Sequence, residues 1–355
     1  MQRIERLMEL AALQADQAII LHKPSNIFYL SGFTGEGLLL VAQGLKAIVT
    51  DFRYTEQAQQ QAPGFEVLVI DNQYNHVRLA AKALEPLHVQ RIRYEDDHVT
   101  VKAFIAMQEA FPGITFESLA LLPEKLRMRK DAQELLLMER ACAISCEAFD
   151  WILGEIKPGM TETDIRLKLD FKVLSLGADG MAFSTIIASG PNGSLPHAVP
   201  GPRKVEKGDM ITLDFGAKYG GYCADMTRTI AVGEPKAEMR KIYAIVQQAQ
   251  AACQDLLAPG KDCRAIDQVA RDIIGEAGYG QYFGHGLGHA VGIDIHEEPR
   301  LSPKAEATLE PGMVMTVEPG IYVPGLGGVR IENSCVITDT GARSLVTAPR
   351  DLIIL

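Results

Sequence analysis

The sequence predicts an α/β domain at the N-terminus, followed by a larger α+β domain built from two similar halves. Three observations predict this fold class. The first third alternates strand-like and helix-like segments, a polar stretch at 121–133 separates two apolar patterns, and the rest of the chain contains a weak internal repeat. The 355 residues are 47% hydrophobic and 23% charged, which indicates a folded chain long enough for more than one core.

The first domain is predicted to be a small α/β domain over residues 1–122. Continuous or alternating apolar stretches indicate strands, and apolar residues at helical spacing indicate helices. The predicted segments are a hairpin over 37–50, a strand over 65–71, a helix near 75–84, a strand over 89–95 and a helix near 101–111. The polar, charged segment 123–130 is predicted to link this domain to the next.

The second domain is predicted to span residues 131–355 and to open with two helices. Apolar residues recur at helical spacing from Asp131 onward, and Pro158-Gly159 ends that helix. Thr161 then opens the next helix, with Asp164 at the capping-box position.

The second domain contains a weak internal repeat. IKPGMTETDI (156–165) resembles LAPGKDCRAI (257–266), EKGDMITLD (206–214) resembles EPGMVMTVE (310–318), and ADMTRTI (224–230) resembles IENSCVI (331–337). The matched site residues are Asp214 with Glu318, Asp225 with Glu332, and His197 with His296. Each half would supply two carboxylates and one histidine to a shared seam. A duplication around a pseudo-twofold axis can also be purely architectural, and this alternative stays open here.

Four acidic residues lie in apolar, strand-like surroundings: Asp214, Asp225, Glu318 and Glu332. Carboxylates gathered in a buried seam repel by about 4 kcal/mol per pair at about 4 Å and an effective dielectric near 20. Two divalent cations would balance them, and carboxylate oxygens with an imidazole suit Mn²⁺, with Co²⁺, Zn²⁺ or Fe²⁺ as alternatives. The competing interpretation pairs the acids with Arg228 and Arg330, or separates them in space.

The glycine-rich segment 283–300 holds three of the eight histidines of the chain. Glycine lets the backbone approach a ligand closely, and neutral imidazole is a common metal ligand. Its histidines, His285, His289 and His296, are therefore candidate site residues together with His197 of HAVP.

These segments resemble the motifs of the pita-bread metallopeptidases, the family of Xaa-Pro dipeptidases (prolidases), aminopeptidases P and methionyl aminopeptidases. The motifs occur in the order LDFG, ADMTRT, GHAVGIDIHEEP, TVEPG and GGVRIEN. The resemblance implies a pita-bread fold for the second domain. It also implies a creatinase-type fold for the first domain, through SNIFYLSGF (25–33) and TDFRYTEQA (50–58). The metal ligands that it implies are Asp214, Asp225, His289, Glu318 and Glu332.

The same resemblance implies catalytic roles for three residues. Glu318 is expected to relay a proton to the leaving nitrogen. His296 is expected to donate a hydrogen bond to the developing oxyanion, and His197 to hold the substrate near its proline. His285 is left with a flanking role in substrate binding.

Two arginines are further candidates for substrate binding. Arg300 is expected to pair with the terminal carboxylate of the substrate, and the alternative is a solvated loop arginine. Arg330, beside Glu332, is expected to orient a metal ligand and to line the substrate site. In related dimers the first domain can contribute to the site of the neighbouring subunit. This makes Asp51, Arg53 and Tyr54 candidates as well, with a structural role as the alternative.

The expected function is hydrolysis of Xaa-Pro bonds in proline-containing peptides, with Xaa-Pro dipeptidase favoured. Aminopeptidase P, which acts on longer peptides, shares the metal motifs and is the alternative. A creatinase-like hydrolase without metals, or a binding module on the same scaffold, would lack the ligand set found here.

Bulk composition argues against other classes of protein. A net charge of −10 without a dense Lys/Arg run argues against a nucleic-acid partner. No stretch reaches the roughly 18 to 20 apolar residues of a membrane span, and the N-terminus lacks the zones of a signal peptide. The six cysteines show no CxxC spacing, which suits a reducing compartment. We therefore expect a cytoplasmic protein, and the family resemblance suggests a homodimer.

Overall fold

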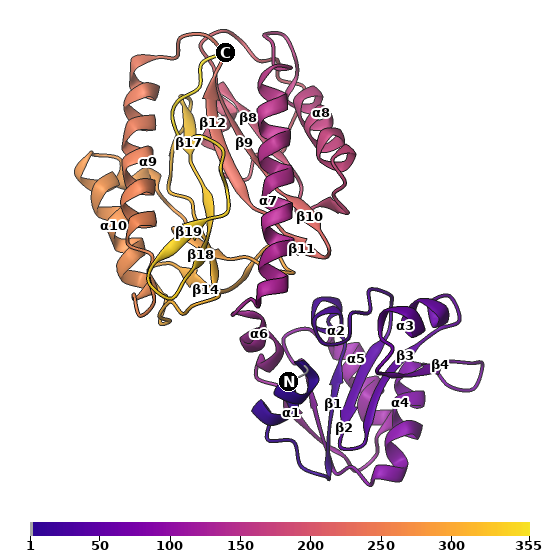
Figure 1. Ribbon diagram of the computed structural model, residues 1–355. Coiled ribbons are helices and arrows are strands. Elements are labelled where there is room, and N and C mark those ends of the chain that lie inside the picture. The colour runs from indigo at the N-terminus through magenta and orange to yellow at the C-terminus, as the bar shows by residue number, and fades with distance from the viewer. Residues whose placement is uncertain (1–2) are drawn as a thin grey trace. The chain divides into compact units, whose positions relative to one another are not determined.

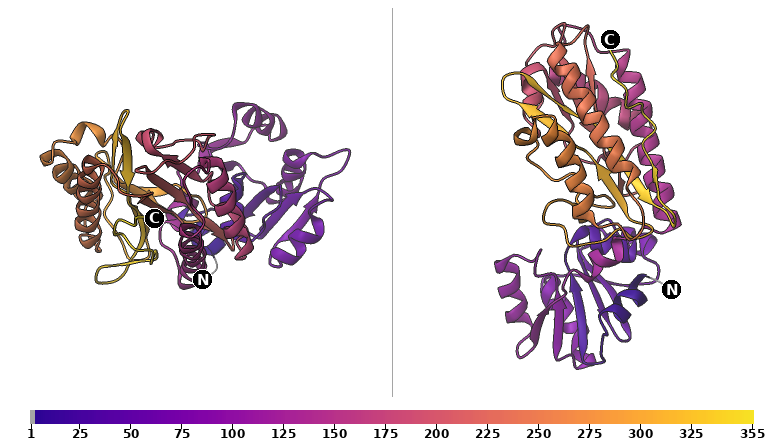
Figure 2. Two further views of the ribbon diagram at one scale, coloured as in Figure 1. Left: turned by 90° about the horizontal axis from the view of Figure 1, so that it is seen from above. Right: turned by 90° about the vertical axis from the view of Figure 1, so that its left-hand side faces the viewer.

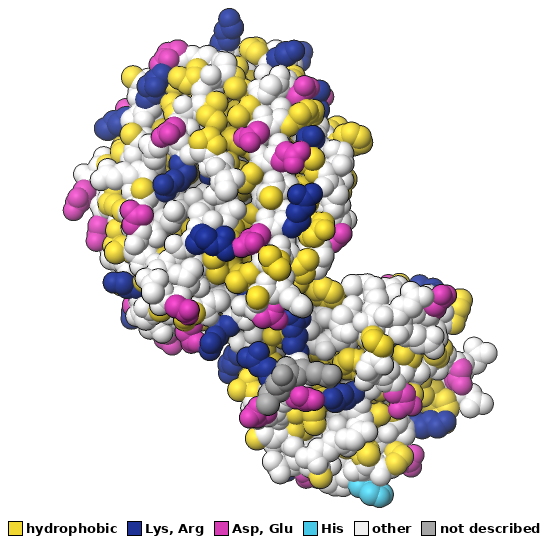
Figure 3. Space-filling model, viewed as in Figure 1, with side chains coloured by type: hydrophobic (Ala, Val, Ile, Leu, Met, Phe, Trp, Pro, Cys, Tyr) yellow, Lys and Arg dark blue, Asp and Glu magenta, His cyan; other side chains and the backbone are white. Residues whose placement is uncertain are grey.

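The computed structural model describes residues 3–355 as two compact units. The N-terminal unit ends at Arg127 and the C-terminal unit begins at Met128. The segment 123–130, predicted as a linker, contains most of helix α6 (Leu122–Arg127), so the first unit continues past residue 122. On the face that Figure 3 shows, side chains of both charges are interspersed on each unit.

The N-terminal unit is an α/β domain around a six-stranded sheet with strand order β4-β3-β2-β1-β5-β6 (Figure 1). Its strands are β1 (Gln17–Leu21), β2 (Leu38–Ala42), β3 (Leu45–Thr50), β4 (Glu66–Val69), β5 (Arg91–Tyr94) and β6 (Thr115–Ser118). Its helices are α1 (Arg3–Leu10), α2 (Pro24–Ser31), α3 (Thr55–Gln61), α4 (His76–Leu84), α5 (Val101–Ala110) and α6. All five residues of β1 are buried, because β2 and β5 pair with its two edges and its residues after Gln17 are apolar.

The C-terminal unit begins with two capped helices. Asp131 caps α7 (Ala132–Leu153) through a capping box with Glu134. Thr161 and Asp164 form the predicted capping box of α8 (Glu162–Ser175). The second half of the unit repeats a helical pair with α9 (Ala237–Asp255) and α10 (Cys263–Glu276). Figures 1 and 2 show the two helical pairs on opposite sides of the strands, as expected for duplicated halves.

Antiparallel strands fill the space between the helical pairs. The first half contributes β7 (Gly180–Met181), β8 (Ile186–Ser189), β9 (Met210–Phe215), β10 (Ala217–Tyr219), β11 (Tyr222–Cys223) and β12 (Met226–Ala231). The second half contributes β13 (Gly288–Ala290), β14 (Glu297–Leu301), β15 (Val314–Val317), β16 (Gly320–Val323), β17 (Gly327–Arg330), β18 (Asn333–Ile337) and β19 (Ala342–Ser344). Strand orders are β12-β9-β8 in one sheet and β14-β13-β15-β18-β19 in another.

The strands that carry the predicted ligands are buried over their whole length. Every residue of β9, β12, β15 and β18 is buried. Apolar residues from both strands and helices form the core beneath them. A carboxylate placed at the end of such a strand is therefore held in a rigid, poorly solvated position. Within residues 3–355, no helix combines the length and the apolar character that a membrane crossing requires.

Candidate metal centre and active site

All residues that the sequence analysis proposes for the site of the second domain line one cavity in the C-terminal unit. They are His197, Asp214, Asp225, His285, His289, His296, Arg300, Glu318, Arg330 and Glu332. The cavity has a volume of about 630 Å³, enough for a small peptide. Strands from both halves of the repeat deliver these side chains, so the duplicated halves share one site.

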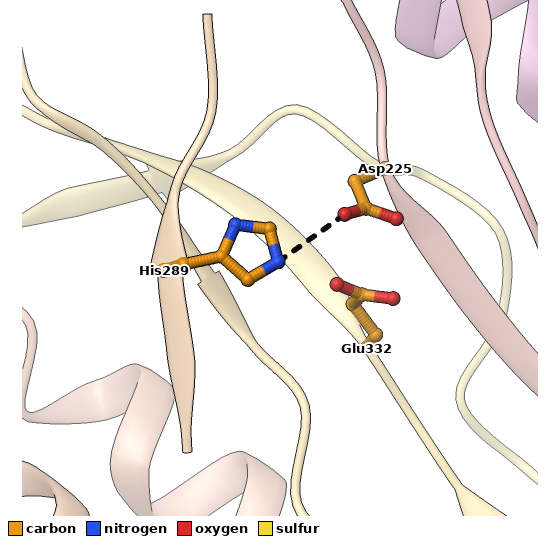
Figure 4. A group of neighbouring side chains, drawn as sticks. All are labelled: Asp225, His289 and Glu332. Atoms are coloured by element: carbon orange, nitrogen blue, oxygen red, sulfur yellow. Dashed lines mark ion pairs between the residues drawn. The ribbon is translucent and has the colours of Figure 1, made fainter. Parts of the chain in front are cut away.

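Asp225, His289 and Glu332 form an acid–imidazole cluster at this cavity. One ligand atom of each residue lies within 4.8 Å of the others, and all three residues are buried. Figure 4 shows the imidazole pointing toward the two carboxylates, which lie side by side. His289 Nε2 lies 3.5 Å from Asp225 Oδ2 and 3.3 Å from Glu318 Oε1. The cluster therefore presents several lone pairs to one small volume.

The environment of His289 favours a neutral imidazole with a free lone pair on Nε2. Its Nδ1 lies 3.1 Å from the carbonyl oxygen of Ala290, which can only accept, so Nδ1 carries the proton. Burial, followed by the neighbouring His296, lowers the pKa of His289 to about 3. This is the protonation state in which histidine binds a metal ion.

The carboxylates around His289 repel one another. Burial and the nearby Glu332 raise the pKa of Asp225 well above its usual value, and burial with Glu318 does the same for Glu332. Burial also raises the pKa of Glu318 to about 8. Within residues 3–355, the buried side-chain oxygens without a hydrogen-bond partner include Asp214 Oδ1 and Glu332 Oε1. The charge and the unused oxygens are what a cation site requires.

Arg330 contacts Asp214 rather than its own neighbour Glu332. Its Nη2 donates to Asp214 Oδ2 at 2.6 Å, and its Nη1 donates to the Tyr322 hydroxyl at 2.9 Å. Thr227 Oγ1 receives a bond from Arg330 Nε at 3.2 Å and donates to Glu332 Oε2 at 2.7 Å. Arg330 thus orients one predicted ligand directly and another through Thr227.

The hydrogen bonds of Arg330 continue to His285. His285 Nδ1 lies 2.7 Å from the Gly286 carbonyl and must donate to it, so His285 Nε2 accepts from the Tyr322 hydroxyl at 2.8 Å. Burial lowers the pKa of His285 to about 4, which keeps it neutral and preserves this direction of donation. His285 therefore supports Tyr322 and Arg330 at the wall of the cavity.

The second arginine of the competing interpretation, Arg228, makes its hydrogen bonds to other groups. It is buried and donates to the carbonyl oxygens of Thr227, Glu332, Ala348 and Pro349 and to Asn333 Oδ1. Among the hydrogen bonds of residues 3–355, none joins Arg228 to a carboxylate oxygen of the four acids. An arginine reaches one of the four predicted carboxylate ligands, through the Arg330–Asp214 pair.

The remaining substrate candidates face the cavity from exposed positions. The His296 ring lies 4.4 Å from the His289 ring, centroid to centroid, at 77°. His197 is exposed on the segment that follows the short 3₁₀ turn Gly190–Ser194. Arg300 Nε lies 3.4 Å from Glu298 Oε1, and about half of its side chain (51%) is exposed. Its guanidinium is therefore available to a ligand.

The comparisons with known proteins give the family. Residues 136–339 match metallopeptidase family M24, and residues 3–129 match the creatinase/prolidase N-terminal domain. The chain belongs to metallopeptidase family M24. It is 41% identical to the uncharacterized peptidase YqhT of Bacillus subtilis, over 99% of this chain and 100% of that protein.

Solved structures are similar to this chain over nearly their full length. An Xaa-Pro dipeptidase from Bacillus anthracis has a TM-score of 0.94 and 41% identity, with 99% of each chain covered. An X-Pro aminopeptidase from Thermotoga maritima has a TM-score of 0.92 and 35% identity, with 100% of each chain covered. These likenesses confirm the pita-bread fold and the creatinase-type N-terminal domain. This M24 chain is a metallopeptidase, and membership of the family implies divalent metal ions.

The M24 site also contains residues that sequence reasoning missed. Tyr322, Phe183 and Ile295 line the cavity, and Thr227 connects Arg330 with Glu332. Thr227 lies inside ADMTRT, the motif that contains Asp225. Nothing in the sequence singles out the others, because each is an ordinary aromatic or apolar residue whose partners are distant along the chain.

The candidates in the N-terminal unit form their own network. Arg53 Nη2 donates to Asp51 Oδ2 at 2.7 Å, and its guanidinium lies 5.2 Å from the centre of the Tyr54 ring. Tyr54 contacts Phe33 edge to face. Arg53 also reaches Glu36 at 3.2 Å. These contacts are compatible with the structural alternative, and a contribution to the site of a neighbouring subunit stays a prediction.

Proposed function

We propose that this M24 metallopeptidase hydrolyses Xaa-Pro peptide bonds and that Xaa-Pro dipeptides are its preferred substrates. The observation that carries the proposal is that the buried acid–imidazole cluster and the half-exposed Arg300 face one cavity of peptide size. The cluster would bind the metal ions that the reaction needs, and Arg300 would bind the terminal carboxylate of a dipeptide. The dipeptidase name of the similar Bacillus anthracis structure supports the same substrate class.

We propose two divalent ions per subunit, with Mn²⁺ as the first candidate and Co²⁺, Zn²⁺ or Fe²⁺ as alternatives. The proposed ligands are Asp214, Asp225, His289, Glu318 and Glu332. Their oxygens and single imidazole suit a hard or borderline cation, and the unpartnered Asp214 Oδ1 and Glu332 Oε1 are open to one. When bound, the ions supply Lewis-acid activation of water and of the substrate carbonyl.

Residues of this chain supply the proton transfers and the positioning. The Glu318 carboxylate, which lines the cavity beside His289, would accept a proton and pass it to the leaving nitrogen. His296, whose ring lies against that of His289, would donate a hydrogen bond to the oxygen of the scissile carbonyl as charge develops on it. His197 would position the proline at the same cavity.

The second candidate function is an Xaa-Pro aminopeptidase that acts on longer peptides. It is favoured by the likeness to the Thermotoga maritima enzyme, which matches over its full length. The two activities differ in the group on the C-terminal side of the proline. A dipeptidase meets a terminal carboxylate at that point, and an aminopeptidase meets another peptide bond. Arg300 is the residue of this cavity that would discriminate between them.

A peptide panel tests the proposal. The wild-type protein is assayed with Mn²⁺ or Co²⁺ on Xaa-Pro, Xaa-Pro-Xaa and proline-free peptides, alongside Arg300→Ala and the matched Arg300→Lys. We expect Xaa-Pro to be the best substrate and Arg300→Ala to lower kcat/KM on it by about tenfold or more, the order of a lost charged hydrogen bond. Tripeptides should be affected less. Equal losses on both peptide lengths would remove Arg300 from carboxylate recognition.

The proposed setting is the cytoplasm, and the proposed assembly is a homodimer. The support for the compartment is the composition: all six cysteines are buried and unpaired with one another. The support for the dimer is the family resemblance alone. Size-exclusion chromatography with light scattering would measure the assembly, and a monomeric mass would refute it.

A further inference from the structure

A buried ion pair joins the start of the C-terminal unit to the segment that carries His296. Lys130 Nζ lies 3.0 Å from Glu297 Oε2, and the exposed fractions of the two side chains are 1% and 7%. Lysine and glutamate are rarely buried to this degree unless they are paired. Such a pair often contributes little net stability, because desolvation opposes its attraction, so its presence calls for another explanation.

The backbone of Lys130 is fixed by its neighbours. Its N–H donates to the Gly312 carbonyl at 2.8 Å, and the next residue, Asp131, caps α7 through hydrogen bonds to two backbone N–H groups. A Cβ on Gly312 would lie 3.0 Å from the Lys130 carbonyl oxygen, so the two backbones are in close contact. The ammonium group therefore extends from a rigid base.

Glu297 ends the loop between β13, which carries His289, and β14. It is the first residue of β14 and pairs with Ala290 of β13, so the loop between them runs from Val291 to His296. Its Oε1 accepts from the Asp294 N–H at 3.2 Å. A Cβ on Gly292 would come within 2.6 Å of both carboxylate oxygens, so the carboxylate packs directly on the loop backbone.

This loop is also attached to β11. The Cys223 N–H donates to the Gly292 carbonyl at 2.8 Å, and Cys223 Sγ donates to the Ile293 carbonyl at 3.3 Å. The loop is also held at its start, where the Val291 N–H donates to the Val314 carbonyl at 3.0 Å. The Lys130–Glu297 pair adds an attachment at its end, next to His296. His296 is the last loop residue and lies directly before Glu297, with an exposed ring against His289.

We propose that the Lys130–Glu297 pair is a positioning device that sets the place of the His296 ring in the cavity. Neither Lys130 nor Glu297 is among the residues that line the cavity. They act through the loop backbone and are positioning residues, not catalytic ones. This inference rests on the proposed peptidase function, since it assigns a purpose to the exact place of His296.

The variant Lys130→Met/Glu297→Gln tests the proposal by removing both charges while keeping similar volume. We expect kcat to fall about tenfold or more, because small displacements of a reacting group carry large rate penalties. KM should change less than about threefold, and Mn²⁺ bound per subunit should equal that of wild type. The matched control is Lys168→Met/Glu155→Gln, the same substitutions at an exposed pair with an N–O distance of 2.7 Å. This control should keep wild-type kcat.

A double-mutant cycle with His296→Ala distinguishes positioning of His296 by the Lys130–Glu297 pair from a general structural role of the pair. In the His296→Ala background, removal of the pair should change kcat by less than about twofold, since the group that it positions is gone. Equal losses in both backgrounds would overturn the proposal. Glu297→Asp, which keeps the charge but shortens the side chain, is the second variant if the neutral pair does not fold, and it should lower kcat in the same way.

A spectroscopic measurement separates this proposal from the proposed function. In metal-free protein with isotope-labelled histidine, the ring resonance of His296, assigned by its loss in His296→Ala, should shift when the pair is removed. The resonance of His22 in the N-terminal unit should not move. An unmoved His296 resonance would overturn the positioning role even if Xaa-Pro peptides are cleaved. A shifted resonance without any peptide cleavage would reject the function and leave the positioning role intact.

Discussion

Replacing Glu332 with Gln should stabilise the metal-free chain while weakening metal binding. Glu332 lies among buried acids, and its pKa is raised well above the usual value by burial and by Glu318 and Asp214. Gln keeps the shape and can still accept the hydrogen bond that Thr227 donates to Glu332 Oε2. The substitution therefore removes charge with little change in packing.

The magnitude can be worked out from the geometry of the cluster. The ligand atoms of Asp225 and Glu332 lie within 4.8 Å of each other, and at that distance two unit charges at an effective dielectric of about 20 repel by about 3.5 kcal/mol. Part of that charge is absent at neutral pH, because the raised pKa values favour protonation. We therefore expect the free energy of unfolding of metal-free Glu332→Gln to rise by about 1 to 3 kcal/mol.

Urea unfolding in EDTA and in saturating Mn²⁺ measures both effects. Metal that binds only the folded chain adds stability according to its affinity, so wild type should gain more from Mn²⁺ than Glu332→Gln does. The exposed Glu306→Gln is the matched control and should change neither curve. Destabilisation of the metal-free chain by Glu332→Gln would refute the proposed charge repulsion. A gain from Mn²⁺ equal to that of wild type would refute the role of Glu332 as a metal ligand.

Three other substitutions probe the proton relay, the cavity wall and the N-terminal unit. Glu318→Gln should nearly abolish turnover, and retention of more than about a tenth of kcat would remove its role as proton relay. Tyr322→Phe leaves Arg330 and His285 without their shared partner and should lower the urea-derived stability by about 1 to 3 kcal/mol; an unchanged midpoint would show that the hydroxyl is dispensable. Burial lowers the pKa of His22 in the folded chain to about 4, from about 6.5 in the unfolded chain. The free energy of unfolding therefore falls as pH drops from about 6.5 to 4, because protonation then favours the unfolded chain. His22→Asn should flatten that decline by up to about 3 kcal/mol, and the same substitution at exposed His88 should not.

Most of the fold could be predicted because the apolar patterns are local. The hairpin over 37–50 corresponds to β2 and β3, with Gly44 at φ 84° between them, where a side chain would be strained. The capping box of Thr161 and Asp164 is also a local signal, because both residues lie within four consecutive positions. The central strand β1 was missed because its short apolar run has no alternation, and burial on both faces becomes visible only once β2 and β5 pair with it.

Only the site residues that belong to the sequence motifs could be predicted. The acids stand at the ends of buried strands, and the internal repeat relates the two halves that bring them together. The supporting contacts have no such signal, because their partners lie far apart along the chain. Arg330 and Asp214 are 116 positions apart, and Lys130 and Glu297 are 167 positions apart. Such pairs are fixed by the folded arrangement, so that arrangement is needed to see them.

The most direct test of the proposed metal centre is anomalous diffraction at the manganese edge from crystals grown with Mn²⁺. We predict two anomalous peaks per subunit within bonding distance of the proposed ligands, with Asp225, His289 and Glu332 among the contacts. Both peaks should weaken or vanish in Asp225→Asn. No peak at this cavity, or peaks that persist unchanged in the variant, would contradict a two-metal centre built from these residues.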